Sequence, residues 1–281
     1  LDLLSDVGDQ ALAYFATLPP EEFSERELLS RSRALYQVGS VRLDQGRAGE
    51  AVAVLTESLR LARELADRRP DDPERLFDLS QSHFWVGYAA WLEGDLSAAE
   101  GHFQEYLHLA ERLVALDGAN LDYRMELGYA QSNLGSVREA RGDLPGAAEA
   151  FRRTLETKRE LVRRDSTNVD WLGELAESHN TLAVVYRKLG RYPEALEQHR
   201  REFELKERVM ELAPGHAYWR SRLAYAHNFK ATLELALGDV DGALASVTAA
   251  ASSMASLAAD DPTNVTLRRD VVMIGRNRAR I

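Results

Sequence analysis

The chain has no cysteine among its 281 residues, which excludes disulfide bridges and thiolate metal ligands. It also has no apolar run of about 18 residues and no basic-then-apolar leader, so we expect neither a membrane-spanning helix nor a membrane partner. The formal net charge of −10 argues against nucleic acid as a partner. Only four of the 35 basic residues are lysine, and this arginine bias is typical of GC-rich bacterial genomes. We therefore expect a cytoplasmic bacterial protein.

Motifs that carry catalysis or bind cofactors are also missing. The sequence contains no glycine-rich phosphate loop, no HExxH or GxSxG motif and no EF-hand ligand spacing. No nucleophile, base and orienting group stand together in a pattern typical of a catalytic site. The sequence therefore predicts a protein that is not an enzyme and that binds no cofactor or metal ion.

A turn that returns every 48 residues is the strongest pattern in the chain. It is marked by five glycines: Gly46, Gly94, Gly142, Gly190 and Gly238. Five residues after each glycine stands an alanine: Ala51, Ala99, Ala147, Ala195 and Ala243. Seven residues before each glycine stands another small residue: Gly39, Gly87, Gly135, Ala183 and Ala231. Small residues at fixed positions let two backbones approach closely, so these columns predict a seam between packed helices.

Each 48-residue unit has the pattern of two helices joined by the glycine turn. Apolar residues at helical spacing precede each glycine for about 20 positions and follow it for about 20 more. The glycine suits the left-handed position just past a helix C-terminus. Ser97, Asp241 or a proline (Pro145, Pro193) then suits the N-cap or first turn of the second helix. Strings rich in Pro, Gly, Asp and Asn end that helix, so each unit is predicted to be a helical hairpin.

These columns resemble the pattern of the tetratricopeptide repeat family, in a long form that adds roughly two turns to each helix. The family's two small positions and its turn glycine correspond to the columns of Gly39, Ala51 and Gly46. The resemblance implies an all-α fold, a right-handed α-solenoid of stacked antiparallel helical hairpins in one continuous domain. It divides the chain into an N-terminal helix (1–20), five repeats (21–69, 70–117, 118–165, 166–213 and 214–261) and a C-terminal helix (262–281), the first helix of a sixth unit.

The resemblance also implies a concave binding groove lined by the first helix of each repeat. The groove-facing positions differ between repeats whereas the packing columns do not, and such variation is typical of recognition. They are Tyr36, Gln81, Phe84, Tyr88, Trp91, Tyr129, Ser132, Asn180, Arg187, Tyr225 and Asn228. Aromatic residues with polar neighbours suit a protein or peptide interface. The alternative is that these aromatic side chains only pack the long helices together.

Histidines occupy the repeat position at which the family has a bulky aromatic residue: His83, His179 and His227, with Gln131 between them. We interpret them as a ladder of polar side chains bonded to the adjacent helix, and a metal-binding or proton-sensing row is the alternative. Two further histidines, His102 and His108, are expected on the surface of a second helix. His199, Trp171 and Trp219 are expected to pack in the interior.

Basic residues gather on two second helices. The segment FRRTLETKRELVRR, residues 151–164, carries Arg152, Arg153, Lys158, Arg159, Arg163 and Arg164, and HRREFELKER, residues 199–208, follows one repeat later. Stacking of the repeats would place both segments in one basic strip on the outer side. We interpret the strip as a solvated helix face with ion pairs at i,i+4, and the alternative is a surface for an anionic partner.

Together these features predict a non-enzymatic scaffold for protein–protein interaction, which binds a protein or peptide segment in its groove. The alternative is a regulatory or sensor segment of a larger bacterial signalling protein, in which the groove holds a fused effector domain. Val271, Val272 and Ile274 make the last helix apolar enough to expect a partner. The natural chain is therefore expected to continue, or to form a homodimer through its ends.

Overall fold

The computed structural model describes residues 10, 13, 24–213 and 215–281. Throughout these residues the regular secondary structure is helical, without any strand. The helix that the sequence predicts over residues 1–20 lies outside the described residues, apart from the two isolated positions. The helices divide between two compact units, Leu1–Asp143 and Leu144–Ile281, which we call unit 1 and unit 2.

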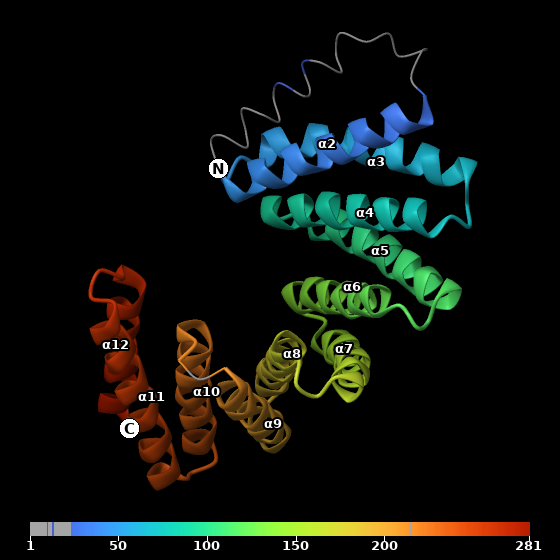
Figure 1. Cartoon of the computed structure of the whole chain (residues 1–281). Helices are drawn as coiled ribbons and strands as arrows, with labels where there is room; N and C mark the ends of the chain where they lie inside the picture. Colours follow the sequence, from blue (N-terminus) through green and yellow to red (C-terminus); the bar gives the residue numbers. More distant parts are fainter. Residues whose placement is uncertain (1–9, 11–12, 14–23, 214) are drawn as a thin grey trace. The chain divides into compact units, whose positions relative to one another are not determined.

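Unit 1 contains α2 (Glu25–Asp44), α3 (Ala48–Arg68), α4 (Pro73–Glu93), α5 (Leu96–Leu116) and α6 (Leu121–Ala140) (Figure 1). Helices that follow one another pack together, and α2 also contacts α4. α2 with α3, and α4 with α5, are the hairpins of the first two repeats. α2 and α4 are therefore adjacent first helices, as stacking of repeats requires.

Unit 2 contains α7 (Leu144–Arg164), α8 (Val169–Lys188), α9 (Tyr192–Leu212), α10 (Ala217–Ala236), α11 (Val240–Asp260) and α12 (Val265–Arg280). α8 with α9, and α10 with α11, form the two most extensively packed pairs, and α7 and α12 pack on α8 and α11. The chain is thus an all-α solenoid of stacked helical hairpins, and the predicted fold class is confirmed. The repeat boundaries, and one continuous domain, stay predictions.

The turn of each hairpin depends on its glycine. φ lies between 72° and 85° at the five glycines of the 48-residue pattern. In the α4–α5 turn, the N–H of Gly94 donates to the carbonyl of Trp91 at 3.0 Å and the N–H of Asp95 donates to that of Ala90 at 2.9 Å. These bonds satisfy the last carbonyls of α4 only if the chain turns through the left-handed region, where a Cβ is strained.

Aspartates next to the turn glycines cap two of the second helices. Asp95 accepts from the N–H of Ala98 at 3.0 Å, and Asp239 accepts from the N–H of Gly242 at 2.9 Å. Ser97 and Asp241 lie in the first turn of α5 and α11. The caps are therefore the residues directly after the glycine, two positions earlier than Ser97 and Asp241.

The small-residue columns lie where paired helices approach most closely. A Cβ added at Gly39 would lie 2.3 Å from Cδ2 of Leu55, and one at Gly87 would lie 2.9 Å from Cε1 of Phe103. The alanine that follows each turn glycine by five residues is fully buried in every repeat. A large side chain from the second helix thus fills the space that the missing Cβ leaves.

Helix α11 is, among the described helices, long and apolar enough to cross a membrane by length and composition alone. Its apolar side, including Val247, Met254 and Leu257, is buried against neighbouring helices. α12 packs on it through Ile274, which is fully buried, and through half-buried Val271, whereas Val272 is 54 % exposed. α11 thus buries one side against its neighbours and leaves Val240 and Leu244 exposed on the other.

Candidate functional site

Four polar pairs link the first helices of successive repeats, each at a separation of 45 residues. In unit 1, Arg33 Nε donates to Asp78 Oδ1 at 3.0 Å, and Gln81 Nε2 donates to Glu126 Oε2 at 2.7 Å. An offset of 45 residues is nearly one helical turn shorter than the 48-residue repeat. Each donor therefore bonds to a residue that lies, on the next first helix, nearly one turn before the position equivalent to its own. This register was not among the predictions from the sequence, although a comparison of each residue with the one 45 positions later reveals it.

The same register continues in unit 2. Arg222 Nε donates to Glu177 Oε1 at 2.9 Å, and the hydroxyl of Tyr225 donates to Asp270. Burial together with this carboxylate raises the pKa of Tyr225 to about 12. The predicted groove residue Tyr225 therefore serves first to join α10 to α12.

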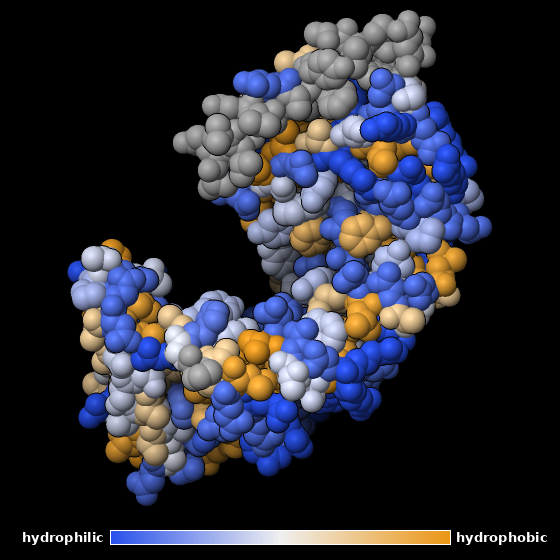
Figure 2. Space-filling view, viewed as in Figure 1, coloured by the Kyte–Doolittle hydropathy of each residue, from blue (hydrophilic) through white to orange (hydrophobic). Residues whose placement is uncertain are grey.

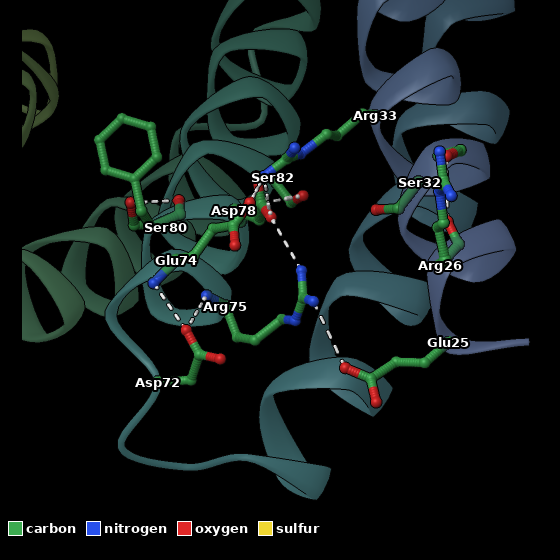
Figure 3. A network of polar contacts seen from close by, with 12 residues as sticks. Glu25, Arg26, Ser32, Arg33, Asp72, Glu74, Arg75, Asp78, Ser80 and Ser82 are labelled. Atoms are coloured by element: carbon green, nitrogen blue, oxygen red, sulfur yellow. Dashed lines mark hydrogen bonds and ion pairs between the residues drawn. The ribbon is translucent and has the colours of Figure 1, made fainter.

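A charged brace stabilises the packing of α2 on α4 (Figure 3). Arg75 Nη2 lies 3.3 Å from Glu25 Oε1, and its Nη1 lies 3.8 Å from Asp78 Oδ2. Asp78 also receives the two bonds of Arg33. Burial raises the pKa of Asp78, and the Arg33 guanidinium opposes that rise. The carboxylate is thus shared by two guanidinium groups, one from each first helix.

Two hollows of about 380 Å³ each lie on the first-helix surface of unit 1. One lies between α2 and α4 and includes the predicted groove residues Tyr36 and Gln81. The other, which we call the aromatic hollow, is lined by Gln81, Phe84, Tyr106, Glu126, Tyr129, Ser132 and Asn133. Four predicted groove residues therefore come together in the aromatic hollow.

Tyr106 and Glu126 complete the aromatic hollow, and sequence analysis did not single them out. Tyr106 comes from the second helix α5, is 2 % exposed, and donates its hydroxyl to Glu126 Oε2. Burial, reinforced by the carboxylate, raises the pKa of Tyr106. Gln81 donates to the same oxygen, and no described residue donates to Glu126 Oε1. One carboxylate oxygen is therefore held in place while the other is available to a ligand.

Other predicted aromatic residues of unit 1 pack against one another. The rings of Phe84 and Tyr88 are stacked with centroids 6.0 Å apart, and Trp85 meets Phe84 edge-on at 5.0 Å. Tyr36 lies 6.1 Å from Trp85, and Trp91 is partly buried on the same core. Tyr88 and Trp91 therefore pack between helices, which was the alternative prediction for the groove residues, whereas Phe84 contacts the core and also lines the hollow.

The predicted groove residues of unit 2 are tied to neighbouring side chains. Arg187 lies 5.1 Å over the ring of Phe229, and Asn228 Oδ1 accepts from Asn277 Nδ2 at 3.1 Å. Asn180 is half-buried on α8. Asn228 lines a smaller hollow of about 130 Å³ between α10 and α12, together with Thr232 and Asn277.

The histidines of this column bond to side chains of other helices and not to one another. His83 Nδ1 lies 3.2 Å from His102 Nδ1, and Arg63 Nη2 lies 3.3 Å from His83 Nε2. Since arginine only donates, His83 carries its hydrogen on Nδ1 and donates it to His102. His102 is half-buried, so the prediction of a surface position was wrong for it and right for His108, which is exposed. The error arose because a small residue, Gly87, lets the second helix lie close.

Equivalent bonds recur in only part of the column. His179 Nδ1 donates to Gln198 Oε1 at 2.8 Å, whereas His227 packs edge-on against Phe203 at 4.6 Å. Burial lowers the pKa of His83 and of His179 to about 4. Over the described residues, no group of three His, Asp or Glu side chains is arranged to hold a metal ion.

A buried charge network crosses unit 2 between α9 and its neighbours. Lys206 bonds to Glu202 and lies 3.2 Å from Glu177, and His199 Nδ1 bonds to Glu202 at 2.5 Å. Lys206, Glu202 and His199 are each 1 % exposed. His199 is thus packed as predicted, but its partners were not foreseen.

The basic strip is only partly at the surface. Lys158 is buried and bonds to Glu174 at 2.6 Å, and Lys206 is buried in the network above, so their placement on an outer strip was wrong. Both occupy the position of buried Ala62 and Ala110, and a long side chain there can only turn inward. Arg152 and Arg153 pair with Glu149 and behave as a solvated helix face.

The two tryptophans predicted to pack differ in degree. Trp219 is 8 % exposed and lies against Gly173, Leu172 and Val209, whereas Trp171 is half-buried. The visible surface of the molecule carries hydrophobic residues in small patches separated by hydrophilic ones (Figure 2). On this face, specific hollows rather than one broad apolar area are therefore the candidates for recognition.

Comparison with known proteins agrees with this architecture. Residues 32–65 and 175–218 match models of the tetratricopeptide repeat. The structure is similar to that of BtubC (BKLC) from P. vanneervenii, with a TM-score of 0.69 and 17 % identity over 91 % of both chains. It is also similar to a Podosopora anserina putative kinesin light chain with nearly identical TPR-like repeats, with a TM-score of 0.57 and 18 % identity over 81 % of this chain and 97 % of that one.

The apo form of RapI has a TM-score of 0.66 and 13 % identity, over 90 % of this chain and 60 % of that one. A search of curated proteins finds no match. Paired helices at a 48-residue period define a helical repeat protein. The chain is a tetratricopeptide repeat protein. Proteins of this kind are in general interaction scaffolds rather than enzymes, and the fold supports that general role.

Proposed function

We propose that the chain is a non-enzymatic scaffold that binds a protein or peptide segment on its first-helix surface, with the aromatic hollow of unit 1 as the anchor site. The observation that carries the proposal is the free oxygen of Glu126 among aromatic rings. Glu126 Oε2 accepts from Tyr106 and Gln81, and Oε1 has no donor among the described residues. An interface anchor needs such a positioned polar group within apolar walls.

The chemistry of the aromatic hollow favours a basic side chain of the partner. Phe84 and Tyr129, which are both half-buried, line the hollow with aromatic rings, and a cation is attracted to the face of such a ring. Glu126 supplies the negative charge, and its carboxylate suits an arginine or lysine head group. The volume of about 380 Å³ accommodates one long side chain. The partner segment is therefore expected to insert an arginine or lysine.

Display of a random peptide library against the whole chain tests the proposal. Selected peptides should be enriched in basic residues, and Glu126→Gln should weaken their binding about tenfold or more while keeping both internal hydrogen bonds. Ser132→Trp should abolish binding by filling the hollow. Glu111→Gln, an exposed change on α5, is the matched control and should leave affinity unchanged.

Substitution at Tyr88 is not a suitable test because its ring stacks on Phe84 and supports the core. Failure to select any peptide, or equal affinity of the Glu126→Gln and Glu111→Gln variants, would contradict the proposal. A partner that binds only when fused to the chain would favour the regulatory alternative, in which the hollow holds an effector domain of the same polypeptide.

The setting of this scaffold is also part of the proposal. It works in the bacterial cytoplasm, as one part of a signalling assembly, without a membrane or nucleic acid. The arginine bias, the net charge of −10 and the burial of the apolar side of α11 support this setting. We also propose that the scaffold forms a homodimer through its ends, and sedimentation of the isolated chain is the test.

A further inference from the structure

A crevice of about 630 Å³ lies between the second helices α7 and α9 of unit 2, with α8 as its floor. Arg159 and Arg163 of α7 form one wall, and Arg201 and Arg208 of α9 lie on the other. The floor includes His179, whose Nδ1 donates to Gln198 Oε1 at 2.8 Å. We call it the arginine crevice. It lies on second helices and shares no residue with the aromatic hollow.

The four arginines differ in whether their guanidinium groups already have hydrogen-bond or ion-pair partners. Arg201 pairs with Glu197 and Glu204, and Arg208 donates to the carbonyl of Ser166 at 3.3 Å. In contrast, the guanidinium groups of Arg159 and Arg163 have no hydrogen-bond or ion-pair partner among the described residues. Two guanidinium groups on adjacent turns of one helix therefore face the crevice with their donors free.

The equivalent crevice of unit 1 provides an internal comparison. Arg63 stands 96 residues, or two repeats, before Arg159, but it donates to His83 Nε2 at 3.3 Å and is engaged. Asp67 stands at the position of Arg163, and Glu105 at that of Arg201. Acidic residues thus balance the arginines in unit 1, whereas unit 2 has arginine at both positions. The excess positive charge is a property of this one crevice rather than of the repeat.

The charge of the arginine crevice selects the kind of anion. Its four arginines and two glutamates leave a net charge of +2, which matches a phosphate monoester of roughly −1.5 to −2 at pH 7. Guanidinium groups bind phosphate oxygens through paired donors. Glu197 and Glu204 on the α9 wall would repel an extended polyanion such as nucleic acid. We propose that the arginine crevice binds the phosphate group of a phosphate monoester, with Arg159 and Arg163 as the principal ligands.

Binding can be measured on the whole chain labelled with ¹⁵N-arginine, by following the arginine Nε–H resonances at constant ionic strength. The probes are phenyl phosphate, O-phosphoserine and inorganic phosphate. Each monoester should shift a few of these resonances saturably, and the Arg159→Gln/Arg163→Gln variant should bind about tenfold or more weakly. Arg63→Gln, at the matched position of unit 1, should bind as the original chain does. Circular dichroism of each variant checks that it is folded.

The probes also distinguish the source of the phosphate. Tighter binding of the monoesters than of inorganic phosphate assigns the crevice to an esterified phosphate, such as one on a modified side chain. Binding of inorganic phosphate as tight as that of the monoesters, or tighter, shows that the crevice does not require an ester, and the assignment to a monoester is then wrong. Absence of a saturable shift, or equal binding by the original chain and the Arg159→Gln/Arg163→Gln variant, overturns the proposal and leaves the proposed function of the aromatic hollow untouched.

Discussion

Replacing Gly173 of α8 by alanine tests the tight packing of successive first helices in unit 2. A Cβ at this position would lie 1.9 Å from Cη2 and 2.3 Å from Cζ2 of Trp219, far inside van der Waals contact. Trp219 is 8 % exposed and cannot swing into solvent without losing that burial. Gly101 of α5 is the matched control, because a Cβ there meets no atom within 4 Å.

The two substitutions should change the free energy of unfolding in opposite directions. At Gly101 only helix propensity acts, so Gly101→Ala should raise the free energy of unfolding by about 0.5–1 kcal/mol. At Gly173 the same gain is outweighed by overpacking, which costs about 1–3 kcal/mol, or more if the Trp219 ring is expelled. Gly173→Ala should therefore lower the free energy of unfolding by about 1–2 kcal/mol.

Urea unfolding followed by circular dichroism measures both changes, with the m-value showing whether the transition keeps its cooperativity. A double-mutant cycle with Trp219→Leu isolates the contact, since the smaller side chain removes the clash. Gly173→Ala should be neutral or stabilising in that background. If Gly173→Ala is as stabilising as Gly101→Ala, or equally destabilising in both backgrounds, the packing of Trp219 on Gly173 is refuted.

Three further changes probe the interior. Ala195→Leu should overpack the seam between α8 and α9 and cost about 1–3 kcal/mol in urea unfolding; unchanged stability would contradict the hairpin register. Burial lowers the pKa of His83 and His179 to about 4 in the folded chain, against 6.5 in the unfolded chain. The free energy of unfolding should therefore be highest above pH 6.5 and should fall by up to about 3 kcal/mol per histidine as the pH drops to 4. Replacing either by glutamine should flatten this acid dependence, and an unaltered profile would exclude that histidine as its source. Lys206→Met should cost about 3 kcal/mol by leaving the buried Glu202 without its ammonium partner and with only His199 bonded to it, and adding Glu202→Leu should recover part of that loss; additive losses would argue against the buried pair.

Where sequence reasoning failed, the failures have a common physical origin. The basic segments on α7 and α9 predicted an outer strip, yet Lys158 and Lys206 turn inward to Glu174 and Glu202. Charge pattern alone does not state on which side of a helix a lysine lies once its neighbours are stacked. His102 was misplaced for a related reason, since only the close approach of α5 to α4 brings it against another histidine.

The candidate sites show the same limit. Gln81, Phe84, Tyr129 and Ser132 were predicted on one surface, but Tyr106 reaches the aromatic hollow from a second helix and Glu126 joins it through the 45-residue register. That register depends on how far two neighbouring helices are shifted along their axes, and the sequence of one helix does not determine this shift. The excess charge of the arginine crevice likewise emerges only when α7 and α9 face one another.

The amino-acid sequence by itself determined the architecture of this protein. A glycine that must turn through positive φ and small residues that must meet at a seam are local requirements, and their return every 48 residues specifies a stack of helical hairpins. Only the tertiary structure decided which polar groups became partners, which lysines were buried and which side chains met in a hollow. Those outcomes depend on helix stagger and on the few ångströms between neighbouring repeats, distances that packing sets and periodicity does not contain.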